Sequence, residues 1–255
     1  RVDNYPGIPG IDGYSLGEKF REHAESLGVE FTEAQVLSLG QKDGIWIIGC
    51  DEDITLESKA VIYATGCKNR PLGVPGEEKY YGRGLSFCAV CDGAFYKGKR
   101  VAVIGGGDTA LDDAMYLSDI CEKVYLVHRR EFFRGSASTL EKLKQKENVE
   151  IIVNVRVEEI TGDKKIDGII LDNKTKLNIS GLFAAVGMIP QTELLKEFGV
   201  LDESNYVKAS EDTKTTVNGL FAAGDVRTKQ LRQVVTAAAD GANAIYSVME
   251  YLRNI

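Results

Sequence analysis

The chain has 255 residues, of which 44% are hydrophobic and 27% are charged, proportions typical of a soluble globular protein. Its net charge is −7 and it contains no long basic run, which argues against nucleic acid and anionic membrane surfaces as main partners. No apolar run approaches the ~18 residues that a membrane span needs, and no signal peptide is seen, so we expect a cytoplasmic location.

Apolar periodicity, glycines and prolines predict elements of both kinds. Helices are expected at residues 15–27, 108–119, 141–146 and 232–255. Strands are expected at residues 29–39, 44–50, 54–56, 58–66, 101–104, 123–127, 149–153, 155–160, 168–171, 177–179, 181–187 and 219–225. Ser15 and Glu18 have the spacing of a capping box for the first helix. The last helix is expected to pack closely through its small residues, Ala237, Ala238, Gly241 and Ala242.

The middle of the chain alternates strand, glycine turn and helix, which indicates a parallel sheet with right-handed crossovers. Pro71 and the pair Pro75-Gly76 indicate a linker before it. The two outer thirds resemble each other, because their strands end in similar turns of small residues. We therefore predict an α/β fold in which a complete dinucleotide-binding unit is inserted between the outer thirds.

The turn at residues 105–110 has the G-x-G-x-x-A pattern of a dinucleotide-binding site, with a strand before it and a helix after it. Gly105 permits the tight turn, Gly107 lets the backbone approach a pyrophosphate, and Ala110 lets the helix pack closely. The N–H groups at the helix start would then meet the phosphates. The predicted binding segment is Gly105, Gly106, Gly107, Asp108, Thr109 and Ala110.

The next strand ends in His128-Arg129-Arg130, and Arg134 follows. NAD enzymes carry an acid there for the ribose 2′-hydroxyl. Guanidinium groups match a 2′-phosphate instead, so the predicted cofactor is NADPH, the alternative being a solvated basic cluster. His128 is interpreted as a supporting residue rather than a general base.

Five cysteines occur in the chain, an odd number that does not suit a secreted disulfide framework. Cys88 and Cys91 lie one helical turn apart, the reach of a disulfide that can open and close. Neither histidine stands at ligand spacing from them, so no metal site is predicted. Asp92 is a candidate proton donor to a departing thiolate. Two buried structural cysteines are the alternative, but the nearby nucleotide turn favours thiol redox chemistry.

Gly224 and Asp225 follow an apolar strand, where a carboxylate can bind a ribityl or ribose hydroxyl group. The helix after Arg232 can direct its first N–H groups at a flavin carbonyl. Without this context, Gly-Asp is an ordinary turn.

Together these motifs resemble the low-molecular-weight thioredoxin reductases, which are flavoprotein disulfide reductases with two dinucleotide-binding domains. The placement of Cys-x-x-Cys within the NADPH domain distinguishes this group. The matching segments run along the whole chain, at residues 4–7, 64–66, 73–77, 88–93, 105–110, 128–130 with 134, 187–190, 219–225 and 232–233.

The resemblance implies two Rossmann-like domains, one for FAD (residues 1–70 and 190–255) and an inserted one for NADPH (residues 71–189). It implies that NADPH reduces FAD, that the flavin reduces the Cys88–Cys91 disulfide, and that the dithiol reduces thioredoxin. Cys88 would attack the partner and Asp92 would be the acid. A homodimer is usual in the family. The residues lining FAD would be Asn4, Ala64, Thr65, Gly66, Gly224, Asp225, Arg232, Gln233 and Val234.

The family begins with a strand, a G-x-G-x-x-G turn and a helix that bind the FAD pyrophosphate, and residues 1–13 contain no such turn. We therefore expect the sequence to start after that segment. Two other functions are compatible with these features. One is the flavin reductase partner of a peroxiredoxin-type peroxide-reducing system, and the other is a non-catalytic fragment that binds NADPH.

Overall fold

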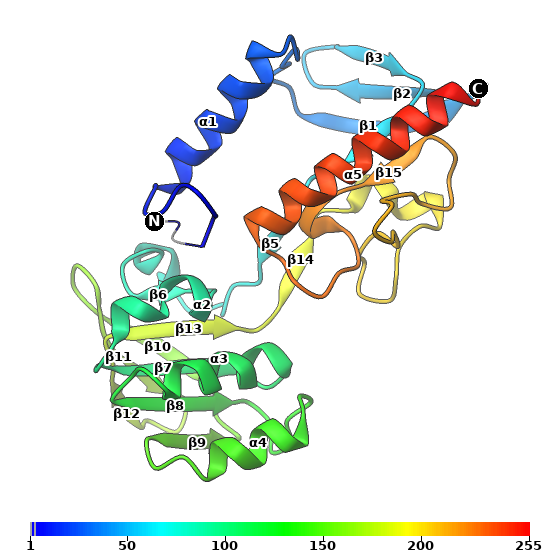
Figure 1. The fold of residues 1–255 in the computed structure, drawn as a ribbon. Helices are drawn as coiled ribbons and strands as arrows, with labels where there is room; N and C mark the ends of the chain where they lie inside the picture. Colours follow the sequence, from blue (N-terminus) through cyan, green and yellow to red (C-terminus); the bar gives the residue numbers. More distant parts are fainter. Residues whose placement is uncertain (1, 3) are drawn as a thin grey trace. The chain divides into compact units, whose positions relative to one another are not determined.

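The computed structural model describes residue 2 and residues 4–255. The chain forms two compact units, residues 1–68 with 189–255 and residues 69–188 (Figure 1). It passes between the units within two short strands, β5 (Cys67–Asn69) and β14 (Met188–Pro190), which pair with each other. The predicted α/β class is confirmed.

The unit of residues 69–188 is built on a parallel five-stranded sheet. Its strand order is β6 (Leu85–Ser86), β13 (Gly181–Ala185), β7 (Arg100–Gly105), β8 (Lys123–His128) and β9 (Val149–Val153). Helices α3 (Asp108–Ser118) and α4 (Ala137–Lys144) form the crossovers on one face (Figure 1). The other face packs against the antiparallel strands β10 (Val157–Gly162), β11 (Ile166–Leu171) and β12 (Lys176–Asn178).

Alternation along β7 divides this unit into two core clusters, because successive side chains of a strand point to opposite faces. Val101 and Val103 join the cluster under α3 and α4, whereas Ala102 and Ile104 join the cluster under the antiparallel strands. The predicted inner face of α3 is confirmed, since Ala110, Leu111, Ala114 and Leu117 are all buried. The apolar character of β7 therefore reflects burial on both faces.

The unit of residues 1–68 and 189–255 contains α1 (Gly13–Ser26), an antiparallel sheet, a parallel strand pair and α5 (Val234–Arg253). The antiparallel strands are β1 (Val36–Lys42), β2 (Ile45–Cys50) and β3 (Thr55–Ser58), and the parallel pair is β4 (Val61–Tyr63) with β15 (Leu220–Ala222). Trp46, the only tryptophan, is fully buried in the core of this unit. The remaining short helices of the chain are η1 (Glu77–Tyr80), α2 (Ala89–Asp92), η2 (Gly93–Tyr96), η3 (Glu193–Phe198) and η4 (Gly224–Val226).

The structure corrects several local predictions: the strand expected at residues 29–39 begins at Val36, and the helix expected at residues 141–146 spans Ala137–Lys144. Two further corrections concern helices α1 and α5. The capping box at Ser15 is wrong, because α1 begins at Gly13 and the Asp12 carboxylate accepts from the Ser15 N–H at 2.9 Å. An aspartate is at least as good an N-cap as a serine. The buried face of α5 is also different from the predicted one, since it consists of Asp240, Ala244 and Ser247 while Ala238 and Ala242 are exposed.

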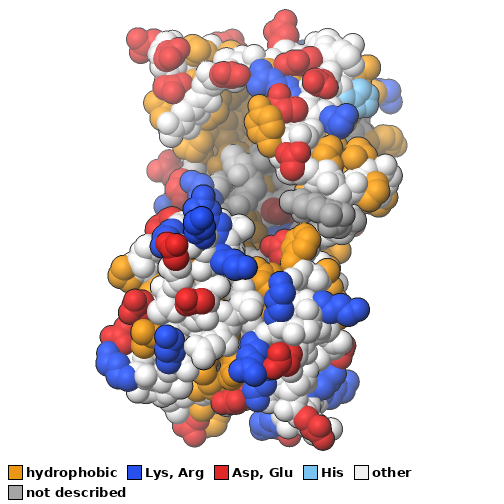
Figure 2. Space-filling model, turned by 90° about the vertical axis from the view of Figure 1, so that its left-hand side faces the viewer, with side chains coloured by type: hydrophobic (Ala, Val, Ile, Leu, Met, Phe, Trp, Pro, Cys, Tyr) orange, Lys and Arg blue, Asp and Glu red, His pale blue; other side chains and the backbone are white. Residues whose placement is uncertain are grey.

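Charges of both signs are interspersed on the coloured surface of the two units in Figure 2. This mixture agrees with a composition of 31 basic and 38 acidic residues, and on this face it leaves no broad field of one sign. Within residues 2 and 4–255, no helix is both long and apolar enough to cross a membrane.

Candidate functional site

Cys88 and Cys91 are joined in a disulfide, with their Cα atoms 5.3 Å apart. Cys88 is the N-cap of α2, and its sulfur accepts a hydrogen bond from the Cys91 N–H at 3.2 Å. Both cysteines are partly exposed. A backbone donor at the start of a helical turn stabilises negative charge on the sulfur at that position, so the turn favours a thiolate on Cys88 after reduction.

Ser86 joins Asp92 to this turn, a role that the sequence analysis missed. The Ser86 hydroxyl donates to Oδ2 of Asp92 at 2.6 Å and accepts from the Cys88 N–H at 3.1 Å. Ser86 is buried at the end of β6. The only sequence signal is a small hydroxyl residue two positions before Cys88, a spacing at which serine often bonds the local backbone. The predicted acid is thus held beside the disulfide by a buried hydroxyl group.

The turn between β7 and α3 requires glycine because a larger side chain would clash with its neighbours, and not because the backbone has unusual φ angles. None of its three glycines is among the residues that the structure describes with positive φ. A methyl group on Gly105 would lie 2.4 Å from the Ala185 carbonyl oxygen, and one on Gly106 would lie 2.2 Å from the His128 ring. A methyl group on Gly107 would meet nothing within 4 Å. Gly107 therefore presents open backbone at the N-terminus of α3, a cradle that fits a pyrophosphate.

The loop after β8 is tied to this turn by backbone hydrogen bonds. The N–H groups of Arg134 and Gly135 donate to the Gly106 carbonyl oxygen at 2.7 and 3.2 Å. The Asp108 carboxylate accepts from the Ser136 N–H at 2.7 Å. The structure thus brings the arginine-bearing loop to the start of α3, where Asp108 and Thr109 are exposed and Ala110 is buried.

Arg129, Arg130 and Arg134 are exposed, and within the described part of the chain no ion pair engages them. His128 is buried beneath the glycine turn and packs on Phe133, with ring centroids 4.8 Å apart. Burial lowers the pKa of His128, and the nearby arginines lower it further. A neutral ring packed under Gly106 suits the supporting role predicted for it.

The predicted flavin residues meet at the carboxyl ends of β4 and β15. The Thr65 hydroxyl donates to the Gln191 carbonyl at 2.6 Å, and the Gln191 N–H donates to the Gly66 carbonyl at 3.0 Å. Arg232 donates to the Asp225 carbonyl at 3.2 Å. Asn4 donates to the Gln233 side chain at 2.7 Å, across 229 residues of sequence. Ala64 directly follows β4, and Val234 is the first residue of α5.

Asp225 has the clearest mark of a ligand-binding side chain in this unit. Its Oδ1 atom is buried and has no hydrogen-bond partner. Burial raises the pKa of the carboxyl group, and Lys229 and Arg232 offset only part of that effect. A buried acceptor without a partner costs about 1–3 kcal/mol. A ribityl or ribose hydroxyl group would satisfy this oxygen, so the position fits FAD.

Asp240 holds the loop that carries Gly224 and Asp225, a role that the sequence analysis did not predict. Its carboxylate accepts from the Gly224 N–H at 2.9 Å, from Arg227 at 2.6 and 2.8 Å, and from Lys229 at 2.7 Å. Asp240 and Arg227 are each only 3% exposed. Burial raises the pKa of Asp240, but the hydrogen bonds from Arg227, Lys229 and Gly224 outweigh it and the net shift is downward.

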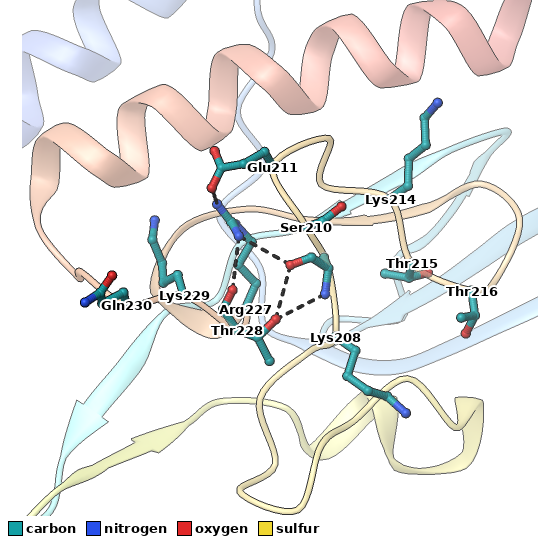
Figure 3. A pocket seen from close by; sticks show the side chains of 11 residues that line it. Lys208, Ser210, Glu211, Lys214, Thr215, Thr216, Arg227, Thr228, Lys229 and Gln230 are labelled. Carbon is teal, nitrogen blue, oxygen red and sulfur yellow. Dashed lines mark hydrogen bonds and ion pairs between the residues drawn. The ribbon is translucent and has the colours of Figure 1, made fainter.

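A separate cavity of about 620 Å³ is lined in part by Arg227 (Figure 3). Lys208, Ser210, Glu211 and Lys214 line it together with Arg227, which makes a 3.5 Å contact with Glu211. This cavity shares no residue with the predicted cofactor sites. Within the described residues, no group of three or more His, Cys, Asp and Glu side chains could hold a metal ion.

Comparison with known families decides the classification. The model of the pyridine nucleotide-disulphide oxidoreductase family matches residues 10–241. The chain belongs to this family. Thioredoxin reductase from Helicobacter pylori is 39% identical, and the alignment covers 99% of this chain and 85% of that protein. Thioredoxin reductase from Bacillus subtilis is 36% identical, with coverage of 100% and 82%.

Solved structures within the family agree with the fold. The thioredoxin reductase of Streptococcus pyogenes has a TM-score of 0.91 and 38% identity, covering 100% of this chain and 85% of that chain. The enzyme from Giardia duodenalis has a TM-score of 0.90 and 37% identity, covering 99% and 85%. The resemblance to thioredoxin reductases is therefore confirmed for both sequence and fold.

Proposed function

We propose that this chain is an NADPH-dependent flavoprotein reductase that reduces the disulfide of thioredoxin. The observation that carries the proposal is the Cys88–Cys91 disulfide at the start of α2, within the unit that also contains the glycine turn. The relatives reported above are named for thioredoxin and do not favour a peroxiredoxin-type partner or a non-catalytic fragment. A homodimer and a cytoplasmic location complete the proposal.

Two sets of residues would hold the cofactors. In residues 69–188, the N–H groups at the start of α3 would bind the NADPH pyrophosphate, and Arg129, Arg130 and Arg134 would bind its 2′-phosphate. In the other unit, Asp225 would accept a flavin hydroxyl group, and the first turn of α5 would face the flavin ring. When bound, FAD passes to the disulfide the two electrons that NADPH supplies as a hydride.

The side chains of α2 would then complete the reaction. Two electrons and one proton break the S–S bond: Asp92 would protonate the Cys91 sulfur, so that Cys91 becomes a thiol and Cys88 a thiolate. Cys88, stabilised by the Cys91 N–H, would attack the disulfide of thioredoxin and form a mixed disulfide. Cys91 would attack Cys88 Sγ in turn, which restores the Cys88–Cys91 disulfide and releases thioredoxin with both its thiols reduced. Two electrons and two protons are transferred in total.

A Cys91→Ser variant tests this function against a matched control. We expect the wild-type chain, supplied with FAD, to oxidise NADPH only when oxidised thioredoxin is present, and we expect Cys91→Ser to abolish this turnover. Cys121→Ser is the control, because Cys121 is buried in the same unit and its thiol donates to the Tyr96 carbonyl, as a serine hydroxyl can. Full turnover by Cys91→Ser, or equal loss in both variants, would contradict the proposal.

A further inference from the structure

Asp108 places a carboxylate at the start of α3, in the turn proposed to hold the pyrophosphate of NADPH. It is exposed and belongs to the first turn of the helix. Like charges oppose each other at close range, so a carboxylate beside an anionic ligand weakens its binding. On charge alone, aspartate is therefore an unfavourable residue at this position. Its value there depends on what else its side chain contacts.

The side chain of Asp108 connects the start of α3 to the start of α4. Its Oδ1 atom accepts a hydrogen bond from the Ser136 N–H at 2.7 Å, and Ser136 is the N-cap of α4. In a capping box, this N–H bonds to a glutamate or glutamine three residues further along the chain. Here that residue is Thr139. Asp108, which lies 28 residues before Ser136, thus supplies the acceptor from another helix.

The segment that leads into α4 lies directly against the glycine turn. The N–H groups of Arg134 and Gly135 donate to the Gly106 carbonyl oxygen, and the Ser136 N–H donates to Asp108. A methyl group on Gly135 would lie only 2.8 Å from the backbone nitrogen of Asp108. Three consecutive N–H groups are therefore bonded to the turn or to the first residue of α3. The bond to Asp108 is the one made by a side chain, so a substitution can remove it.

These contacts hold the backbone of Arg134 on both sides. Its own N–H is bonded to Gly106, and two residues later the chain is bonded to Asp108. Arg134 itself is exposed. A backbone that is ordered in advance lowers the entropy that a long side chain loses when it binds a ligand. The 2′-phosphate is present in NADPH and absent from NADH, so this order favours NADPH alone.

We propose that Asp108 is a positioning residue that sets the preference for NADPH over NADH: it holds the arginine-bearing loop through the Ser136 N–H, so that Arg134 is poised to bind the 2′-phosphate. This inference rests on the proposed function, which assigns Arg134 to that phosphate. Asp108 acts through Arg134 and not through contact with the cofactor. Loss of its hydrogen bond therefore lowers the affinity for NADPH more than the affinity for NADH.

Equilibrium binding of the two nucleotides to the FAD-free chain tests the inference. The dissociation constants of NADPH and NADH are measured by titration of nicotinamide fluorescence, and their ratio is compared between variants. Effects on the pyrophosphate cancel in this ratio, because both nucleotides contain it. The wild type should bind NADPH at least about tenfold more tightly, since a charge-assisted hydrogen bond to the 2′-phosphate contributes about that factor.

The variants Asp108→Asn and Asp108→Ala separate the hydrogen bond from the charge. Both remove the negative charge, but asparagine keeps an acceptor for the Ser136 N–H and is as good as aspartate in such a role. Asp108→Asn should therefore keep at least the preference of the wild type, whereas in Asp108→Ala the preference should be about fivefold lower than in Asp108→Asn. Asp112→Ala is the control, because Asp112 is an exposed carboxylate one helical turn further along α3. Its ratio should equal that of the wild type.

Two results would overturn the inference while leaving the proposed function intact. One is an equal preference for NADPH in Asp108→Ala and Asp108→Asn, and the other is an equal fall in Asp112→Ala. Failure of the proposed function would appear differently, as equal binding of NADPH and NADH by the wild-type chain. That result would also remove the preference that Asp108 is proposed to set.

Hydrogen exchange, measured by NMR on the wild-type chain, covers the case in which Asp108→Ala does not fold. Ser136 is exposed, so without a partner its amide would exchange at the rate of an unstructured chain. Bonded to Asp108, it should exchange at least about tenfold more slowly. Saturation with NADPH should slow this exchange more than saturation with NADH, because a ligand that binds the held loop stabilises that state. Equal exchange rates with the two nucleotides would overturn the inference.

Discussion

Replacement of Asp240 by asparagine should cost the unit of residues 1–68 and 189–255 about 3 kcal/mol of stability. The carboxylate is the shared partner of Arg227 and Lys229, whose side chains are 3% and 7% exposed. Removal of one partner of a buried ion pair costs about 3–5 kcal/mol, because the remaining charge is left uncompensated. The lower end of this energy range applies here, because Arg227 keeps its hydrogen bonds to the carbonyl groups of Ala209 and Thr228 at 3.3 and 3.1 Å.

Fluorescence of Trp46 during urea unfolding is a suitable assay. Trp46 is the only tryptophan and is fully buried in this unit, so the signal reports on the unit that contains Asp240. The corresponding fall in melting temperature is about 6–12 °C, on a scale of roughly 2–4 °C per kcal/mol. Glu250→Gln is the control, because it breaks an exposed ion pair with Lys214 and should change stability by less than about 0.5 kcal/mol.

The effect of pH on this variant has a defined sign. The pKa of Asp240 is lower in the folded state than the ordinary value of 3.8, so its stabilising contribution is present above pH 3.8 and is lost as the pH falls through the folded pKa. The difference between wild type and Asp240→Asn should therefore be largest near neutral pH and shrink in acid. A loss below about 1 kcal/mol at neutral pH would refute the buried ion-pair argument.

Three further predictions concern the cofactor sites. Asp225→Ala should weaken FAD binding at least about tenfold, measured by quenching of flavin fluorescence, while the FAD-free chain unfolds at the same or a higher urea concentration. Gly106→Ala should destabilise its unit by about 1–3 kcal/mol, because the new methyl group would meet the His128 ring at 2.2 Å. Gly107→Ala should keep the fold, because its methyl group would meet nothing within 4 Å, and should weaken NADPH binding. Arg130→Ala should lower kcat/KM for NADPH about tenfold and leave NADH unaffected.

Each of these predictions has an outcome that would contradict it. Unchanged FAD affinity in Asp225→Ala would mean that the unpartnered oxygen does not face the flavin. Wild-type stability in Gly106→Ala would show that His128 can move away at little cost. An equal loss of NADPH and NADH turnover in Arg130→Ala would remove the 2′-phosphate as the group that this arginine binds.

Local sequence signals were sufficient for most of the parallel sheet unit. The alternation of apolar strands with a glycine turn and a helix predicted β7, α3, β8 and β9 within one residue at each end, because each element satisfies its own backbone hydrogen bonds or buries a continuous apolar run. The spacing of Cys88 and Cys91 likewise predicted their disulfide, since a separation of three residues on one helical turn already brings the sulfur atoms together.

Other features depended on residues that are distant in sequence. The N-cap of α1 was missed by three residues, because aspartate and serine are nearly equivalent caps and local pattern does not separate them. The buried face of α5 was also not predicted. A charged residue is normally expected on the exposed face of a helix, but Asp240 is buried because it forms ion pairs with Arg227 and Lys229. Only packing in three dimensions reveals a buried carboxylate that is compensated in this way.

The sequence by itself determined the order of the elements, the glycine turn between β7 and α3 and the pairing of Cys88 with Cys91, because these follow from periodicity, glycine placement and short spacings. Only the tertiary structure shows why residue 106 must be a glycine: the His128 ring lies beneath it and leaves no room for a side chain. It alone left Asp225 with a buried oxygen that has no partner. Steric exclusion and burial are properties of contacts between distant segments, and a linear pattern does not contain them.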